Sequence, residues 1–417
     1  MKIVYMLHDG LNYNGGPAIN AVRLLPELQK RGHSITAIAL YFDFPTNAKH
    51  LEENGIPTIT KQYSEYSEDL VQWIVQTVKH IAPDVFIPNT SFQGGFAARW
   101  VRESGIPTVI AHRGDNALNW SLVKTFAGGK KRWQVSGLLC VSESLRRKAS
   151  SIIAKEVKTK VIPSGVPASS HQSLQQGETL RVVYAGRLEQ RQKRVQDLLT
   201  SFIWVLSQNR EIEFTIVGDG KEKEFLEKEI RKHRLTDKIR LTGRLLGKSY
   251  QEELSSHHVI VLMSDYEGIP GSLMDGMACG LVPISLQTDG IDELVIHQQT
   301  GWLIDNRKDS FLSALNTLRN QSLRKQLSKN AINHIHRAFS LEMATDRWES
   351  FCQELVEESP GKTFIQVPNR LILPLNTLSY EGTNRKYKPL GYWIKQGSVR
   401  GKRKLQRLKL LINRITP

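Results

Sequence analysis

Short apolar runs alternate along the chain with segments in which apolar residues recur every three or four positions. The runs predict buried strands, and the recurring pattern predicts amphipathic helices. In the first half we expect strands at Lys2–Leu7, Ile35–Leu40, Val85–Pro88, Ile106–Ala111 and Leu138–Val141. We expect one helix that ends near Arg31 and two more at Asp69–Ile81 and Phe96–Ser104. In the second half we expect strands at Arg181–Ala185, Phe214–Val217, Ile239–Gly243, Val259–Met263, Leu281–Ser285 and Thr300–Ile304, and a helical pattern over Asp309–Arg347. Such alternation with short links predicts an α/β fold with parallel sheets.

Composition indicates the number of domains and the class of the protein. The chain has 417 residues, enough for two or three domains, and 40% of them are hydrophobic. Its three cysteines are far apart, which predicts neither a disulfide framework nor a metal site. The N-terminus begins as a strand, so we expect no signal peptide, and no apolar run reaches 18 residues. A cytoplasmic protein fits these features.

One stretch of the second half, residues 264–280, joins a strand to a helix through a loop rich in Gly and Pro. A helix N-terminus that follows such a loop offers free backbone N–H groups to an anion. Glu267 precedes the glycines, and Asp275 lies one turn into the helix. Sugar hydroxyls are good partners for these carboxylates, because one carboxylate accepts two hydroxyls. The alternative is an ordinary strand–turn–helix with carboxylates on its surface.

This stretch resembles the Glu-x7-Glu signature of the retaining glycosyltransferases of family 4, the group 1 glycosyltransferases. The resemblance implies a GT-B fold, with two Rossmann-like domains facing across a cleft. It places Glu267 against the donor sugar and Asp275 on the ribose hydroxyls. The loop backbone would reach the sugar and the diphosphate through Gly268, Ile269, Pro270, Gly271, Ser272 and Leu273. Asp275 stands where the family has Glu, so its shorter side chain leaves the ribose contact or the nucleotide preference open.

Other segments carry the same resemblance. Arg187 and Lys193 follow a strand and match the basic pair that neutralises the leaving diphosphate, although Arg191 and Arg194 are rival candidates. With that pair, no metal or cofactor is required. Further donor contacts are implied for Gly15 and Gly16 near the phosphate, for Gly243, Arg244 and Leu245 near the base, and for His112 near the reacting carbon. For His112, a loop histidine bonded to backbone is the alternative, and Gly15-Gly16 is also compatible with a plain turn.

The resemblance also divides the chain. We expect an acceptor domain over residues 1–165 and a nucleotide-sugar domain over residues 166–358. The link Val161–Val166 matches the family's Ile-Pro-Asn-Gly-Val segment with Ser164 in place of Asn, and a helix near Ala344–Val356 should return to the first domain. Residues 359–417 lie beyond the resemblance and form a basic extension.

Charge is concentrated in that extension. The net charge is +16, and residues 382–417 hold 11 Lys and Arg without any Asp or Glu, which leaves 46 basic against 41 acidic residues elsewhere. Lys402–Ile415 places four apolar residues on one stripe among basic ones, which predicts a basic amphipathic helix suited to an anionic membrane surface. A basic extension without a specific partner is the alternative. Aromatic and basic residues also mix between Asn119 and Gly137, where a helix with its aromatic residues in the core is the favoured interpretation.

The function expected from these features is transfer of a sugar, with retention, from a nucleotide diphosphate sugar to an acceptor hydroxyl. Polysaccharide or glycolipid biosynthesis would supply a sugar or lipid-linked acceptor, and the enzyme would lie on the inner membrane face. A nucleotide-sugar epimerase on the same fold is one alternative, and a non-catalytic protein that binds a sugar or lipid head group is another. Nucleic acid is not an expected partner, because the body of the chain is nearly balanced in charge and carries no nucleic-acid-binding module.

Overall fold

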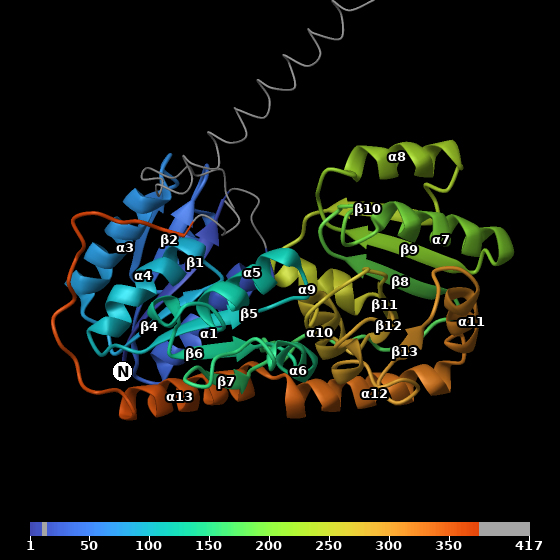
Figure 1. Ribbon diagram of the computed structural model, residues 1–417. Helices are drawn as coiled ribbons and strands as arrows, with labels where there is room; N and C mark the ends of the chain where they lie inside the picture. The colour runs from blue at the N-terminus through green and yellow to red at the C-terminus, as the bar shows by residue number, and fades with distance from the viewer. Residues whose placement is uncertain (11–14, 375–417) are drawn as a thin grey trace, which may run out of the picture.

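Figure 1 shows the computed structural model of the chain, in which residues 1–10 and 15–374 are described. They form two α/β halves side by side, each built on its own sheet. Among these residues no helix is long and apolar enough to cross a membrane. The amphipathic helix predicted at Lys402–Ile415 lies outside the described residues.

The first sheet has seven parallel strands in the order β3-β2-β1-β4-β5-β6-β7. Its strands are β1 (Lys2–Asp9), β2 (Ser34–Tyr41), β3 (Thr58–Gln62), β4 (Val85–Asn89), β5 (Thr108–His112), β6 (Gly137–Cys140) and β7 (Lys158–Val161). Its connecting helices are α1 (Gly16–Lys30), α2 (Thr46–Glu53), α3 (Ser67–Ile81), α4 (Phe92–Glu103), α5 (Ala117–Phe126), the short η1 (Lys131–Trp133) and α6 (Glu143–Ala149). The order reverses at β1, next to β4, which is where ligands bind in doubly wound sheets.

The second sheet repeats this plan with six parallel strands in the order β10-β9-β8-β11-β12-β13. Its strands are β8 (Leu180–Ala185), β9 (Ile212–Val217), β10 (Ile239–Gly243), β11 (Val259–Leu262), β12 (Val282–Leu286) and β13 (Trp302–Ile304). Its helices are α7 (Val195–Gln208), α8 (Lys223–Lys232), α9 (Gly247–Ser255), α10 (Gly271–Ala278), the short η2 (Ile291–Glu293), α11 (Asp309–Thr317) and α12 (Gln321–Ala338). The chain thus has the predicted α/β class, with two Rossmann-like sheets.

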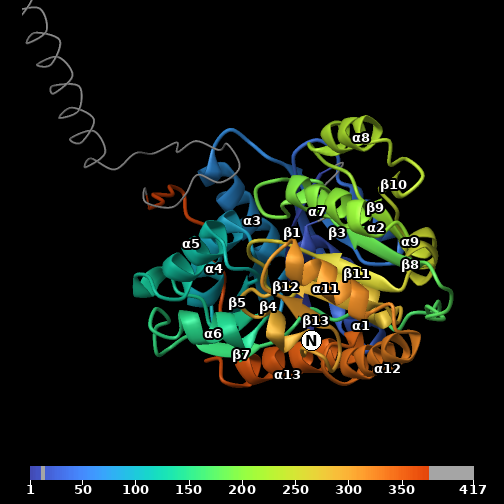
Figure 2. The same ribbon diagram turned by 90° about the vertical axis from the view of Figure 1, so that its right-hand side faces the viewer.

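The last helix of the described residues, α13 (Leu341–Glu357), leaves the second half and packs on the first. Trp348, Phe351 and Leu355 are buried in the hydrophobic core of the first sheet, where Trp348 meets the ring of Tyr5 edge-on at 6.1 Å. Figures 1 and 2 show α12 and α13 running along one side of the molecule, beneath both halves. The returning helix predicted near Ala344–Val356 is therefore present and longer at both ends.

The helical pattern predicted over Asp309–Arg347 is confirmed. It is divided into α11, α12 and the start of α13, and both breaks are capped by side chains. Asn320 accepts a hydrogen bond from the Leu323 amide, and Ser340 accepts one from the Met343 amide. A side-chain oxygen that caps a new helix fixes its first turn, which ends the preceding one.

Aromatic residues between Asn119 and Gly137 lie in the core, as favoured from the sequence. Phe126 and Trp133 are buried, and both contact Phe96 of α4 edge-on. Trp120 is half-buried and donates through its indole N–H to Asp115 at 2.6 Å. These rings are therefore used for packing in the first half.

We predict that Phe351→Ala destabilises the first half by about 3–5 kcal/mol, because it removes a buried aromatic ring from a packed core. Gln353, an exposed neighbour on the same helix, supplies the matched control, and Gln353→Ala should change stability by less than about 0.5 kcal/mol. Chemical denaturation of both variants measures the difference. Equal stabilities would mean that α13 is not part of this core in solution.

Candidate functional site

The loop between β11 and α10 meets the carboxyl end of β5 from the other half. A side-chain carbon placed on Gly268 would lie 2.5 Å from the Arg113 carbonyl oxygen, so only glycine allows this approach. Arg113 directly follows His112, the last residue of β5. The two halves therefore touch where the sequence predicted donor residues from both.

Glu267, at the start of this loop, forms an ion pair with Lys193. The Lys193 Nζ to Glu267 Oε1 distance is 2.6 Å, and the two side chains are only 12% and 9% exposed. Lys193 lies between β8 and α7, so two neighbouring strands of the second sheet each supply one charge. A shielded pair of this kind is costly to break by removing one partner, because the other charge is left uncompensated.

Arg187 lies farther out, half exposed, and contacts Glu189 at 3.1 Å. It also donates to the Gln192 side chain at 3.3 Å, and Gln192 in turn donates to the Tyr266 carbonyl at 3.0 Å. Gln192 thus joins Arg187 to the segment beside Glu267, a role that nothing in the sequence indicated.

The rival Arg194 has other partners: its Nε lies 2.5 Å from Asp197 and 3.6 Å from Asp265. Its guanidinium is engaged in holding the start of α7 to the loop after β11. Arg194 therefore has a structural role, whereas Lys193 pairs with Glu267 and Arg187 is linked to the neighbouring Tyr266 through Gln192.

His112 is completely buried at the end of β5, with its ring 4.5 Å from that of Trp120. Neither ring nitrogen makes a well-formed hydrogen bond within the described part of the chain, although Asn119 lies near enough to favour the charged form slightly. Burial lowers the pKa of His112 to about 4, and Asp115 opposes this only in part. The ring is therefore neutral at pH 7, and it is not the backbone-bonded loop histidine of the alternative interpretation.

Asp275, one turn into α10, forms an ion pair with Arg23 of α1 at 2.9 Å. Two other links join the halves nearby. Glu293 accepts hydrogen bonds at 2.8 Å from the amides of Glu143 and Ser144, at the start of α6. Lys148 bridges Asp115 of the first half and Asp289 of the second. Although burial opposes it, the Lys148 and Trp120 hydrogen bonds keep the pKa of Asp115 below its usual range.

The remaining predicted contacts are backbone positions at element ends. Gly15 precedes the first turn of α1, where no side-chain cap is present, and Gly16 has open space where a side chain would project. Gly243 ends the edge strand β10 with a φ of +75°, and its carbonyl accepts from the Gly218 amide at 2.9 Å. Arg244 and Leu245 follow it and are half-buried. All of these positions lie at or next to the ends of elements.

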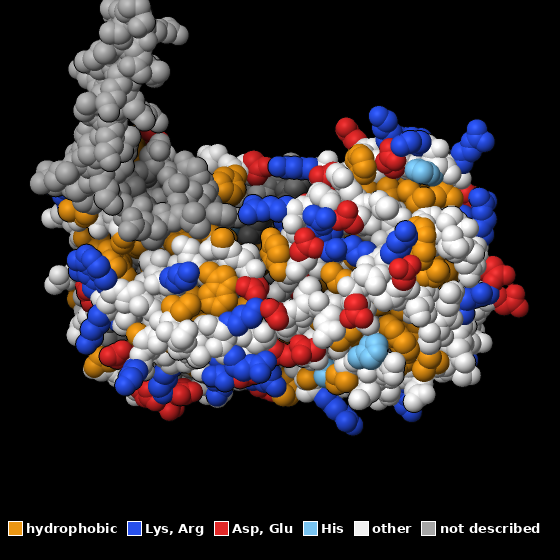
Figure 3. Space-filling model, turned by 45° about the vertical axis from the view of Figure 1, so that its right-hand side comes forward, with side chains coloured by type: hydrophobic (Ala, Val, Ile, Leu, Met, Phe, Trp, Pro, Cys, Tyr) orange, Lys and Arg blue, Asp and Glu red, His pale blue; other side chains and the backbone are white. Residues whose placement is uncertain are grey.

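The loop residues predicted to surround the donor sit around the start of α10. Ile269 and Ser272 are half-buried, Pro270 and Leu273 are buried, and Gly271 is exposed as the first residue of the helix. No side chain caps this helix start. Its first N–H groups are therefore available to an anion. Figure 3 shows Lys and Arg side chains at the rim of a hollow between the two halves.

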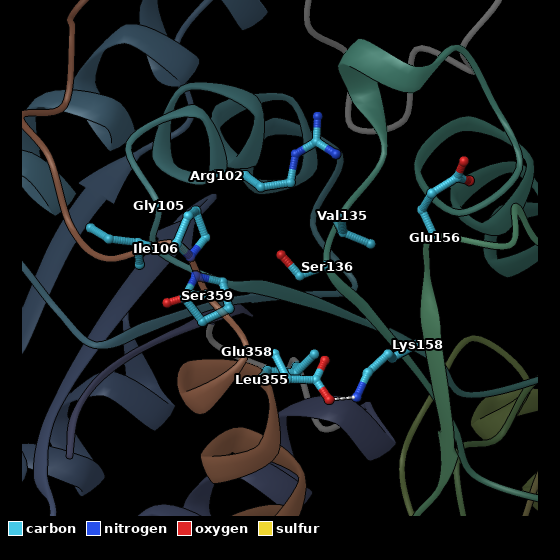
Figure 4. A pocket seen from close by; sticks show the side chains of 12 residues that line it. Arg102, Gly105, Ile106, Val135, Ser136, Glu156, Lys158, Leu355, Glu358 and Ser359 are labelled. Carbon is cyan, nitrogen blue, oxygen red and sulfur yellow. Dashed lines mark hydrogen bonds and ion pairs between the residues drawn. The ribbon is translucent and has the colours of Figure 1, made fainter.

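A cavity of about 220 Å³ lies elsewhere, beside the amino ends of β5, β6 and β7. Figure 4 shows Arg102 and Glu156 at one end and the Lys158–Glu358 ion pair at the other. Arg102 donates to the Lys131 carbonyl at 3.0 Å, so its charge is used to hold η1. Ligands of parallel sheets bind at the opposite, carboxyl edge. Among the described residues no cluster of three His, Cys, Asp or Glu could hold a metal ion.

Comparison with known proteins agrees with this architecture. The profile "Glycosyl transferases group 1" matches residues 167–334, and "Glycosyltransferase Family 4" matches residues 14–170. The chain is 23% identical over 168 residues to N-acetyl-alpha-D-glucosaminyl L-malate synthase of Bacillus anthracis, covering 40% of this chain and 43% of that protein. It is 30% identical over 148 residues to UDP-Gal:alpha-D-GlcNAc-diphosphoundecaprenol alpha-1,3-galactosyltransferase of Escherichia coli, covering 34% and 37%. The alignments thus span less than half of either relative.

Among solved structures, Anabaena Alr3699/HepE in complex with UDP-glucose has a TM-score of 0.68 and 18% identity, covering 85% of this chain and all of that one. At this identity the likeness shows the fold, which is GT-B. Since the two profiles together extend from residue 14 to residue 334, the chain belongs to the group 1 glycosyltransferases.

Proposed function

We propose that this protein transfers a sugar from a nucleotide diphosphate sugar to an acceptor hydroxyl and retains the anomeric configuration. The observation that carries the proposal is the shielded Lys193–Glu267 pair, which adjoins the free N–H groups at the start of α10 and faces the end of β5. Carboxylate, cation and anion-binding amides are the groups needed to hold a sugar joined to a diphosphate. The Glu-x7-Glu-like spacing from Glu267 to Asp275 supports retention.

In this proposal the second half binds the donor. Arg187 and Lys193 stabilise the negative charge that grows on the departing diphosphate, and the α10 amides share that charge. Glu267 accepts hydrogen bonds from the donor sugar, and Asp275 accepts them from the ribose. Gly243, Arg244 and Leu245 border the base, and Gly15 and Gly16 approach the phosphate from the other half. Because two cations face the diphosphate, the reaction needs no metal.

His112 supplies a neutral ring to the sugar side of the site. Its unpaired nitrogens are buried, and a buried polar atom without a partner costs roughly 1–3 kcal/mol. A donor-sugar hydroxyl would satisfy one of them, so part of that cost is recovered when the donor binds. A neutral imidazole can both donate and accept, which a charged ring cannot.

The nature of the substrates is proposed from relatives and charge. The Anabaena structure holds UDP-glucose, and the E. coli relative acts on a diphosphoundecaprenol-linked sugar, by their names. We therefore expect a UDP-sugar donor and a lipid-linked or sugar acceptor used in polysaccharide or glycolipid synthesis. A basic segment over residues 382–417 would hold the enzyme at the cytoplasmic, anionic face of a membrane.

We predict that Glu267→Ala lowers sugar transfer by roughly 100-fold or more, because it removes a group that orients the donor and leaves Lys193 uncompensated. The control is Glu229→Ala, which breaks a Glu–Lys pair on the outer helix α8. Product analysis by NMR reads the anomeric configuration and separates transfer from epimerisation of the donor. Near-normal turnover in Glu267→Ala would move the site elsewhere.

Arg187→Ala and Lys193→Ala should each weaken binding of UDP about tenfold or more, because each removes a charge-assisted hydrogen bond worth about 1.5–3 kcal/mol. Arg240→Ala is the control, since Arg240 pairs with Glu253 away from the loop. Calorimetry in magnesium and in EDTA should give the same affinity for the unaltered chain. Unchanged affinity in both variants would contradict the phosphate assignment, and loss of binding in EDTA would contradict metal independence.

The full chain should sediment with phosphatidylglycerol vesicles at low salt, and a chain ending at Gly382 should not. Each basic residue near an anionic surface contributes about 1 kcal/mol, and salt screens the attraction. Phosphatidylcholine vesicles are the neutral control. Equal sedimentation of the two chains on anionic vesicles would remove the extension as the anchor.

A further inference from the structure

The two halves are joined by an ion pair at a residue expected to bind the donor. Arg23 Nη2 lies 2.9 Å from Asp275 Oδ1 and 3.0 Å from Oδ2, so one nitrogen holds both carboxylate oxygens. The side chains are 22% and 14% exposed. Burial opposes the charge of Arg23, but the Asp275 carboxylate outweighs it and raises the pKa of Arg23. The Arg23 guanidinium is therefore charged at neutral pH.

The helices that carry the pair place it just behind both expected phosphate-binding ends. Asp275 is the fifth residue of α10 and Arg23 the eighth of α1. At 1.5 Å per residue they lie about 6 Å and about 10 Å from their helix starts. Tyr250 of α9 borders both charges, and burial keeps its pKa well above the usual range, so it remains a neutral phenol. The pair thus forms one wall between the halves, close to the site.

Arg23 has unused capacity to bind a ligand. Within the described residues its hydrogen bonds all come from Nη2, which leaves the Nε and Nη1 donors available. Asp275 keeps lone pairs for hydroxyl donors even when Nη2 is bound, because a carboxylate has about four acceptor sites. A guanidinium beside a carboxylate offers donors and acceptors together, which is the combination that a vicinal diol needs.

We propose that Arg23 is a positioning residue of the ribose subsite, and that Arg23 and Asp275 form this subsite only when the two halves are closed. The inference rests on the function proposed above. Aspartate is one methylene shorter than the glutamate of the related signature, and the ion pair fixes its carboxylate from the opposite half. Binding of the ribose diol is thereby coupled to closure, since opening the halves separates the two charges.

The test compares affinity for ribose and for its 2′-deoxy form. Calorimetry measures Kd for UDP, GDP and ADP and for their 2′-deoxy counterparts, and the ribonucleotide that binds most tightly is carried forward. For the unaltered chain we expect a ribose preference of about tenfold, the value of one charge-assisted hydrogen bond. Arg23→Ala should weaken ribonucleotide binding by that factor, leave the deoxy form nearly unchanged, and so abolish the preference.

Arg31→Ala is the matched control. Arg31 directly follows the same helix and pairs with Glu349 at 3.0 Å, but this contact is with α13, which packs on the first half. The Arg31→Ala variant should keep the ribose preference. Asp275→Ala should lose the preference as Arg23→Ala does, and the double variant should bind no more weakly than Asp275→Ala. Arg23→Gln, which keeps a polar side chain but removes the charge, should lose the preference too. Melting curves verify that each variant is folded.

The outcomes of this test distinguish failure of the ribose subsite from failure of the proposed function. A ribose preference retained in Arg23→Ala and Arg23→Gln overturns the subsite and leaves the donor site intact. Tighter nucleotide binding in these variants also overturns it, because the pair would then be a latch that the donor has to break. If no ribonucleoside diphosphate binds the unaltered chain, the proposed function fails and the subsite fails with it.

Discussion

Parallel strands set the constraint on which the rest of this structure depends. Every strand pair in the two described sheets is parallel, so within each sheet all carboxyl ends lie on one edge. The loops that carry Glu267 and Lys193 leave those edges, and His112 is the last residue of β5 at such an edge. Two such edges facing one another give a site with walls from both halves, and the contact of Gly268 with the Arg113 carbonyl shows how closely they meet.

The charged side chains around the candidate site form ion pairs, some within one half and some between the two halves. Lys193 and Glu267 belong to one half and are shielded. Arg23 with Asp275, and Lys148 with Asp289, join opposite halves. Pairs of the second kind hold the two halves together as they lie here, whereas the pair of the first kind lies within one half.

The sequence predicted the local parts of this structure well. Apolar periodicity located nearly all strands, because a buried parallel strand is a continuous apolar run wherever it occurs. The Gly-rich loop and the returning helix were also found, since both are local patterns. The helical pattern over Asp309–Arg347 did not show where one helix ends and the next begins, because the caps Asn320 and Ser340 are single polar residues inside a periodic stretch.

Long-range partners of the site could not be found in this way. Arg23 lies 252 positions before Asp275, and Glu293 lies about 150 positions after the amides that it caps. Gln192 is close to Arg187 in sequence, yet its bond to the Tyr266 carbonyl depends on how β8 and β11 are placed side by side. None of these residues has a periodicity or spacing that distinguishes it from an ordinary surface polar residue.

Packing of α13 on the first sheet has a consequence for the synthesis of the chain. The first sheet is complete once β7 has been made, but its core lacks Trp348, Phe351 and Leu355 until the ribosome has added roughly 190 more residues. At about 5–20 residues per second, that interval lasts roughly 10–40 s. During it, the surface that α13 later covers is exposed to water and to chaperones. The half made first is therefore completed last, and its folding cannot end before the second half has been translated.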